Sequence, residues 1–115
     1  MNHYDYMSLA MQEAKKALTS REIPIGAMIV SHDAVVAAAL NHCANRSEPT
    51  AHAEILAIKK ASAILGNWRL TGCSLYVTIE PCPMCAGAAV NAHLSSIIYG
   101  APNPWYGGID SKFRI

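Results

Sequence analysis

Residues 81–109 contain no Asp, Glu, Lys or Arg, although the whole chain has only 115 residues. Such a stretch raises the question of a membrane span, which requires about 20 mostly apolar residues in a row. Prolines, glycines, serines and asparagines recur through residues 81–109, so no such run is present. We therefore predict that this charge-free stretch is buried inside a folded domain or against another subunit.

The composition predicts one compact domain over residues 1–115. The chain is 52% hydrophobic and 15% charged, whereas an average soluble domain is about 25% charged. This balance excludes intrinsic disorder, which requires low hydrophobicity and high net charge. The formal net charge is +1 with no basic tract, so a nucleic acid would have to be held by a small local patch and a specific pocket.

The N-terminal segment predicts a cytoplasmic protein without a membrane anchor. Charged residues interrupt the apolar positions of residues 1–20, which excludes a signal peptide there. In a reducing compartment, cysteines bind metals or carry redox chemistry more often than they form disulfides. The chain has four of them: Cys43, Cys73, Cys82 and Cys85.

Hydrophobic periodicity predicts an α/β fold. Helices are expected over residues 5–19, 51–65 and 83–93, and strands over 25–30, 34–40, 75–79 and 97–99. Residues 41–49 are expected to form a loop, with Thr50 capping the second helix and Gly66 ending it. Two strand–helix–strand crossovers predict parallel neighbours, while the short turn after residue 30 predicts an antiparallel pair. We place Trp68, Tyr76 and Met84 in the core.

Two motifs carry the chemistry: His52-Ala53-Glu54 and the segment Pro81 to Cys85, which reads Pro-Cys-Pro-Met-Cys. Cys82 and Cys85 are three residues apart, so they share one face of the first helical turn. One imidazole and two thiolates suit zinc, and three protein ligands leave a fourth position open for water, as in catalytic sites. Both motifs are predicted at helix N-termini, where the helix dipole favours thiolate.

The cysteine pair also has other interpretations. A Cys-x-x-Cys pair alone is typical of a redox site or of half a structural zinc site, which Cys43 or Cys73 could complete. Cys73 stands just before a predicted strand, and Cys43 lies in a predicted loop without a second cysteine at that spacing. The combination with His-x-Glu favours the catalytic zinc site.

His-x-Glu followed by Pro-Cys-x-x-Cys resembles the signature of the zinc-dependent cytidine-deaminase-like superfamily. Within it, the chain is similar to the bacterial tRNA-specific adenosine deaminases from about residue 5 to residue 111. The segments that carry this similarity are residues 21–27, 49–55, 67–70, 75–82 and 84–88. The resemblance implies a three-layer α/β/α cytidine-deaminase-like fold with a mixed central sheet. It also implies a homodimer with one Zn²⁺ per subunit.

The resemblance further implies hydrolytic deamination of adenosine to inosine at the wobble position of a tRNA anticodon loop. His52, Cys82 and Cys85 would hold zinc, which lowers the pKa of water. Glu54 would take the proton of that water and deliver protons first to ring N1 and then to the departing amine, so that ammonia leaves and inosine remains. By the same resemblance, the substrate-binding residues are Pro24, Ile25, Asn41, Ala53, Ile79 and Asn103.

The chain departs from the family in three places. The family usually continues with another strand and C-terminal helices that help to bind the anticodon stem, so we expect a domain without those helices and an open sheet edge. Asn103 stands where the family has an aspartate beside the ribose; asparagine can also donate, which predicts a weaker preference for RNA. Only Lys112 and Arg114 follow Arg69, which predicts weak, salt-sensitive tRNA binding.

Two alternative functions remain open from the sequence. A small-molecule deaminase acting on guanine, cytosine or a nucleoside is favoured by the near-neutral charge. A non-catalytic, zinc-stabilised interaction module is disfavoured, because a structural zinc site has no need of Glu54. The continuous similarity around both motifs and residues 67–70 favour tRNA.

Overall fold

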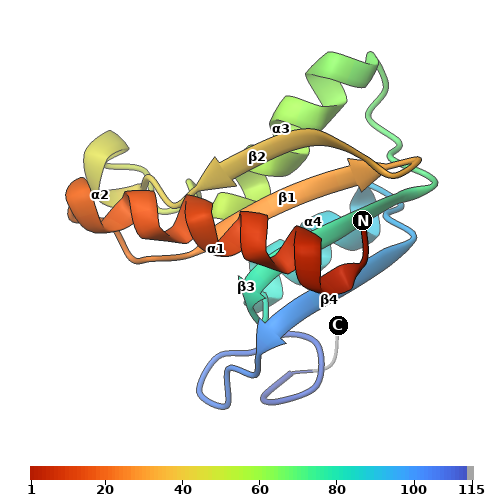
Figure 1. Cartoon of the computed structure of the whole chain (residues 1–115). Coiled ribbons are helices and arrows are strands. Elements are labelled where there is room, and N and C mark those ends of the chain that lie inside the picture. Colours follow the sequence, from red (N-terminus) through yellow and green to blue (C-terminus); the bar gives the residue numbers. More distant parts are fainter. Residues whose placement is uncertain (114–115) are drawn as a thin grey trace.

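The computed structural model describes residues 1–113, so Arg114 lies outside the described residues. The elements follow in the order α1 (His3–Thr19), β1 (Gly26–Ser31), β2 (Ala34–Leu40), α2 (Cys43–Arg46), α3 (Ala53–Leu65), β3 (Cys73–Ile79), α4 (Pro83–Asn91) and β4 (Ser96–Ala101). Helix α1 covers one face of the sheet, and α3 and α4 cover the other (Figure 1). This confirms the three-layer α/β/α architecture.

The central sheet has four strands in the order β2-β1-β3-β4. Strand β1 pairs antiparallel with both β2 and β3, whereas β3 and β4 are parallel. The prediction of parallel neighbours is therefore right for β3 and β4 and wrong for β2 and β3, which run in the same direction with β1 between them. Strand β1 takes the central place because almost all of it is buried, while β2 exposes its first residues at the edge. Strand β4 forms the other edge, as predicted.

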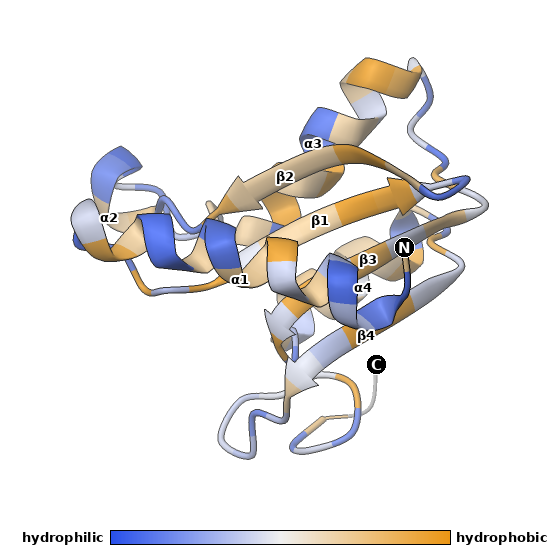
Figure 2. Cartoon of the chain, in the orientation of Figure 1, coloured by the Kyte–Doolittle hydropathy of each residue, from blue (hydrophilic) through white to orange (hydrophobic). Residues whose placement is uncertain are grey.

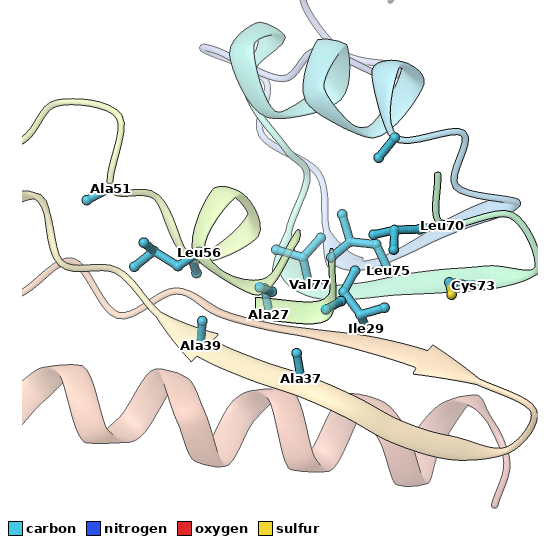
Figure 3. Packing of buried hydrophobic residues seen from close by; sticks show 14 residues of the cluster. Ala27, Ile29, Ala37, Ala39, Ala51, Leu56, Leu70, Cys73, Leu75 and Val77 are labelled. Atoms are coloured by element: carbon cyan, nitrogen blue, oxygen red, sulfur yellow. The ribbon is translucent and has the colours of Figure 1, made fainter. Parts of the chain in front are cut away.

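Each face of the sheet has its own apolar core. Ile29, Leu75 and Val77 point to the side covered by α3 (Figure 3). On the other face, Met28 and Tyr76 pack against α1. Successive residues of a strand point to opposite faces, so β1 and β3 supply both cores.

Two of the three predicted core residues lie at the surface instead. Tyr76 is buried, but the Trp68 side chain is 62% exposed and that of Met84 is 37% exposed. Trp68 lies against the His93 ring, with the Arg69 guanidinium over its face, so its contacts are made at the surface. Those placements were wrong because Trp68 lies in a loop and Met84 lies in the first turn of α4 beside a cavity, so neither side chain reaches the interior.

Tertiary contacts also changed two helix assignments. Helix α2 lies in the predicted loop, where its Ala44 and Asn45 backbone N–H groups donate to the buried Glu22 carboxylate. Helix α3 begins after His52 rather than after Thr50. Residues 41–49 are polar and lack the apolar periodicity of a helix. The contact that stabilises α2 comes from Glu22, which is distant in the sequence.

Helix α1 alternates hydrophilic and apolar residues along its length, whereas β1 is apolar almost throughout (Figure 2). Within residues 1–113, no helix is long and apolar enough to cross a membrane. Beyond β4, residues 102–113 form turns without regular helix or strand. This C-terminal loop returns to the start of α4, next to the candidate site.

Candidate functional site

The sheet topology brings the two sequence motifs together. Strands β2 and β3 run in the same direction, so both strands finish at the same end of the sheet. The segment leading into α3 is tied to the end of β2 by the His42 backbone N–H, which donates to the Ala51 carbonyl. Helix α4 follows the end of β3 directly. The N-termini of α3 and α4 therefore converge, in the position where α/β sheets usually bind ligands.

His52, Cys82 and Cys85 form the only group of three or more potential metal ligands found among residues 1–113. The His52 Nδ1 atom lies 3.6 Å from the Cys82 Sγ and 3.4 Å from the Cys85 Sγ. For tetrahedral zinc, the usual bond lengths place a nitrogen and a sulfur ligand about 3.5 Å apart. The donor set and its spacing thus fit a zinc ion with one position left open.

The N-cap residues of α3 and α4 both contribute their side chains to this group of metal ligands. His52 is the N-cap of α3 and Cys82 that of α4, and neither side chain caps its helix. Pro83 occupies the first turn of α4, where its missing N–H costs nothing. The backbone N–H groups of that turn stay directed at Cys82 and favour its negative form.

The two thiols have opposite proton affinities in the metal-free protein. The hydrogen bond from Cys85 outweighs burial and, with backbone N–H groups and His52, lowers the pKa of Cys82 to about 5. The same hydrogen bond, with burial, raises the pKa of Cys85 above its ordinary value. Cys82 is therefore the thiolate of the pair at neutral pH.

Glu54 lies in the first turn of α3 with a side chain that is only 2% exposed. Its Oε1 atom has no hydrogen-bond partner among the described residues. Burial is the main cause that raises the pKa of this carboxyl. A buried carboxyl that has one oxygen without a partner is suited to exchanging a proton with a bound ligand.

A cavity of about 380 Å³ opens beside these residues. Its lining consists of Ile23, Ile25, His52, Glu54, Ile79, Glu80, Cys82, Asn103 and Tyr106. A second cavity of about 230 Å³ shares His52, Cys82 and Tyr106 with the first. The site is thus a largely apolar pocket that also contains the polar groups of His52, Glu54 and Cys82.

The predicted substrate-binding residues divide into two groups. Ile25, Ile79 and Asn103 line the larger cavity. Pro24, Asn41 and Ala53 are not among the described residues that line it. Pro24 is exposed, whereas Asn41 and Ala53 are buried behind the site; their roles stay predictions.

Glu80 was not singled out by the sequence analysis. The Glu80 carboxylate is 1% exposed and accepts the backbone N–H groups of Asn103, Ile109, Asp110 and Ser111. Burial acts to raise its pKa, but the Ser111 hydroxyl and these N–H groups lower the pKa to about 2. Two adjacent glycines in the facing loop, at 107 and 108, were the available signal of a close approach.

The remaining cysteines stand apart from the three-ligand group. Cys43 and Cys73 are free thiols, as are Cys82 and Cys85. Cys73 is buried at the start of β3, and Cys43 contacts Asn41 at the start of α2. Neither joins the His52 group in the described chain, which argues against a four-ligand structural site.

Comparison with known proteins assigns this arrangement to a family. The model of the MafB19-like deaminase family matches residues 1–109. The chain belongs to this deaminase family. Its members' fold accounts for the mixed sheet and for the position of both motifs at helix N-termini.

This deaminase-family chain is 48% identical to the tRNA-specific adenosine deaminase of Bacillus subtilis over 99 residues. That alignment covers 86% of the chain and 62% of the Bacillus protein, so the chain spans less than two thirds of that relative. A structure from studies of A-to-I editing by tRNA:A34 deaminases superposes with a TM-score of 0.94 at 42% identity, over 96% of this chain and 85% of that one.

A guanine deaminase from Bacillus subtilis is also similar in structure. It gives a TM-score of 0.86 at 39% identity, over 89% of this chain and 66% of that one. The fold of the family is therefore shared by enzymes named for a polynucleotide and for a free base. These likenesses confirm the cytidine-deaminase-like fold.

Proposed function

We propose that this chain catalyses zinc-dependent, hydrolytic deamination of adenosine to inosine at the wobble position of a tRNA anticodon loop. The observation that carries the chemistry is the unpaired, buried Glu54 Oε1 in the cavity that also holds His52 and Cys82. The choice of substrate rests on the relatives, which are named tRNA-specific adenosine deaminases.

His52, Cys82 and Cys85 would hold the metal, and zinc bound there would supply a water that ionises near neutral pH. The protein's own residues do the rest of the work. Glu54 accepts a proton from the water and delivers it to the ring nitrogen as the hydroxyl adds to the ring carbon. It then passes a second proton, from that hydroxyl, to the amine, which departs as ammonia. The buried position of Glu54 excludes bulk water, so the proton stays within the site.

The cavity suits one nucleoside. Its volume of about 380 Å³ lies at the small end of the range for ligand pockets, which is about 300–1,000 Å³. Ile23, Ile25 and Ile79 supply an apolar wall against which a base can lie. A base within an RNA loop can reach such a pocket only when it is turned out of its stack.

We also propose a homodimer, a cytoplasmic location and contact between Asn103 and the ribose. The apolar helix α4 leaves Val90 exposed, which suits a homodimer face. The bacterial tRNA-specific relatives support a cytoplasmic location for the enzyme. Asn103 Oδ1 accepts the Tyr106 backbone N–H, which leaves the Asn103 amide as a donor toward the ribose. A reduced preference for RNA over DNA follows from that donor.

The test offers the zinc-loaded protein three substrates in parallel: an anticodon stem-loop, free nucleosides and free bases. Ammonia release and sequencing of inosine are the readouts. Inosine at the wobble position with no turnover of free bases is the expected result. Turnover of free bases alone would refute the tRNA substrate, and bound zinc without any turnover would refute catalysis. Matched RNA and DNA loops test the role of Asn103.

A guanine deaminase is the second candidate, because such an enzyme shares the fold at a TM-score of 0.86. The formal charge of +1 also provides little attraction for a polyanion. Guanine in the free-base arm of the same experiment separates the two functions. Ammonia from guanine, with no inosine in the stem-loop, would favour this candidate.

A further inference from the structure

The C-terminal loop after β4 is built around a single buried carboxylate. Glu80 accepts four backbone N–H groups, at distances of 2.7 to 3.0 Å, and the hydroxyl of Ser111. All five donors lie in residues 103–111, which contain no regular helix or strand. The only ion pair among residues 1–113 joins Lys16 to Glu13, so Glu80 is balanced by these donors and by no cation.

The loop packs closely on Glu80 and on the start of α4. A Cβ atom added to Gly107 would lie 2.4 Å from the Glu80 Cδ atom, and one added to Gly108 would lie 2.8 Å from the Cys82 carbonyl carbon. The Gly108 N–H also donates to the Pro81 carbonyl. From β4, the Tyr99 hydroxyl donates to Asp110. The loop is thus fixed against the same motif that supplies two metal ligands.

This loop forms one wall of the candidate site. Asn103 and Tyr106 both line the larger cavity, and Tyr106 lines the adjoining one as well. The Tyr106 side chain is exposed and so is available to a ligand. Without regular structure of its own, the loop depends on Glu80 for the position of both side chains.

We infer that Glu80 is a positioning residue, which holds residues 102–111 over the cavity so that Asn103 and Tyr106 contact the substrate nucleoside. The inference rests on the proposed function, since it assigns the loop to the same substrate. Glu80 borders the same cavity, but all of its hydrogen-bond partners lie in the loop. Its carboxylate acts through the loop, so its loss weakens substrate binding rather than the proton transfer at Glu54.

Two variants test this with different chemistry. Glu80→Gln replaces one acceptor oxygen with an N–H₂ group that faces N–H donors. Gly107→Ala leaves the carboxylate intact but forces the loop away from it. The matched control is Gly87→Ala in α4, because a Cβ atom added there meets nothing within 4 Å. Ser111→Ala removes only the hydroxyl donor and serves if Glu80→Gln does not fold.

Three readouts distinguish positioning from a general structural role. Glu80→Gln and Gly107→Ala are expected to keep their zinc and a kcat close to wild type, while the KM for the stem-loop rises about tenfold or more. In a Trp68→Phe background, Trp105 is the one remaining tryptophan, and its fluorescence anisotropy should decay faster in both variants. Ser111→Ala should show the same changes at smaller size, and Gly87→Ala none.

An unchanged KM and an unchanged Trp105 anisotropy in the folded variants would overturn the inference. Loss of zinc and kcat with an unaltered KM would also overturn it, because Glu80 would then act on the metal ligands. The anisotropy is measured without substrate. If the wild-type protein fails to deaminate the stem-loop, the proposed function fails, while the anisotropy still shows whether Glu80 holds the loop.

Discussion

Replacing Glu54 by glutamine should make the protein inactive and, at neutral pH, more stable. The Glu54 side chain is 2% exposed and its Oε1 atom has no partner among the described residues. Glutamine keeps the shape and still leaves a polar atom at this position, but it removes the charge that burial disfavours. The metal-free Glu54→Gln protein should therefore gain, at neutral pH, about 1.4 kcal/mol for each unit by which burial raises the pKa of Glu54. Loss of the proton carrier should lower kcat by about 10²- to 10⁴-fold.

The pH dependence has a definite sign. Burial raises the pKa of Glu54 from its ordinary value of 4.5, so the folded protein binds this proton more tightly than the unfolded chain does. The free energy of unfolding therefore falls as the pH rises from 4.5 through the raised pKa. Glutamine does not titrate, so the stability advantage of Glu54→Gln over wild type should increase as the pH rises through that range.

Urea denaturation of the metal-free proteins on either side of that range measures the difference. Glu22→Gln is the matched control, because the buried Glu22 carboxylate accepts the N–H groups of Ala44 and Asn45 at 3.1 and 2.7 Å. That variant should lose about 1–3 kcal/mol. The reasoning is refuted if Glu54→Gln loses stability as Glu22→Gln does, or if its kcat stays within about tenfold of wild type.

Other predictions concern packing and the metal ligands. A Cβ atom added to Gly26 would lie 2.0 Å from the Ala10 carbonyl oxygen, so Gly26→Ala should lower the free energy of unfolding, measured in urea, by about 3 kcal/mol. Gly87→Ala should raise it by about 0.5–1 kcal/mol. Equal stabilities of the two variants would contradict this. The pKa of Cys82 is lowered from 9.0 to about 5, so the metal-free protein should gain stability as the pH rises between these values, and Cys82→Ser should abolish that slope. By atomic absorption, Cys82→Ser should lose zinc and Cys43→Ser should keep it; equal zinc contents would exclude the predicted ligand set.

The sequence alone predicted the parts of the molecule that depend on neighbouring residues. Hydrophobic periodicity located every strand, and the bounds of β2 agree with the prediction. Gly66 ends α3 in the left-handed conformation that favours glycine. His52, Cys82 and Cys85 could be grouped from their motifs because metal chemistry restricts the residue types and spacing that serve a zinc ion. Each of these features depends on residues within one or two short segments of the sequence.

Tertiary structure alone decided which distant groups meet. Strand β1 lies between β2 and β3, where the backbone N–H and C=O groups of this buried strand can pair on both sides. Helix α2 forms because Glu22 accepts its N–H groups from another part of the chain. Glu80 gains its role only when a loop more than 20 residues further along the chain folds back onto it. A charge-free stretch can therefore be identified from sequence, but the sequence did not show that Glu80, just outside it, binds the backbone of its last residues. Hydrogen bonds between distant residues leave no local pattern.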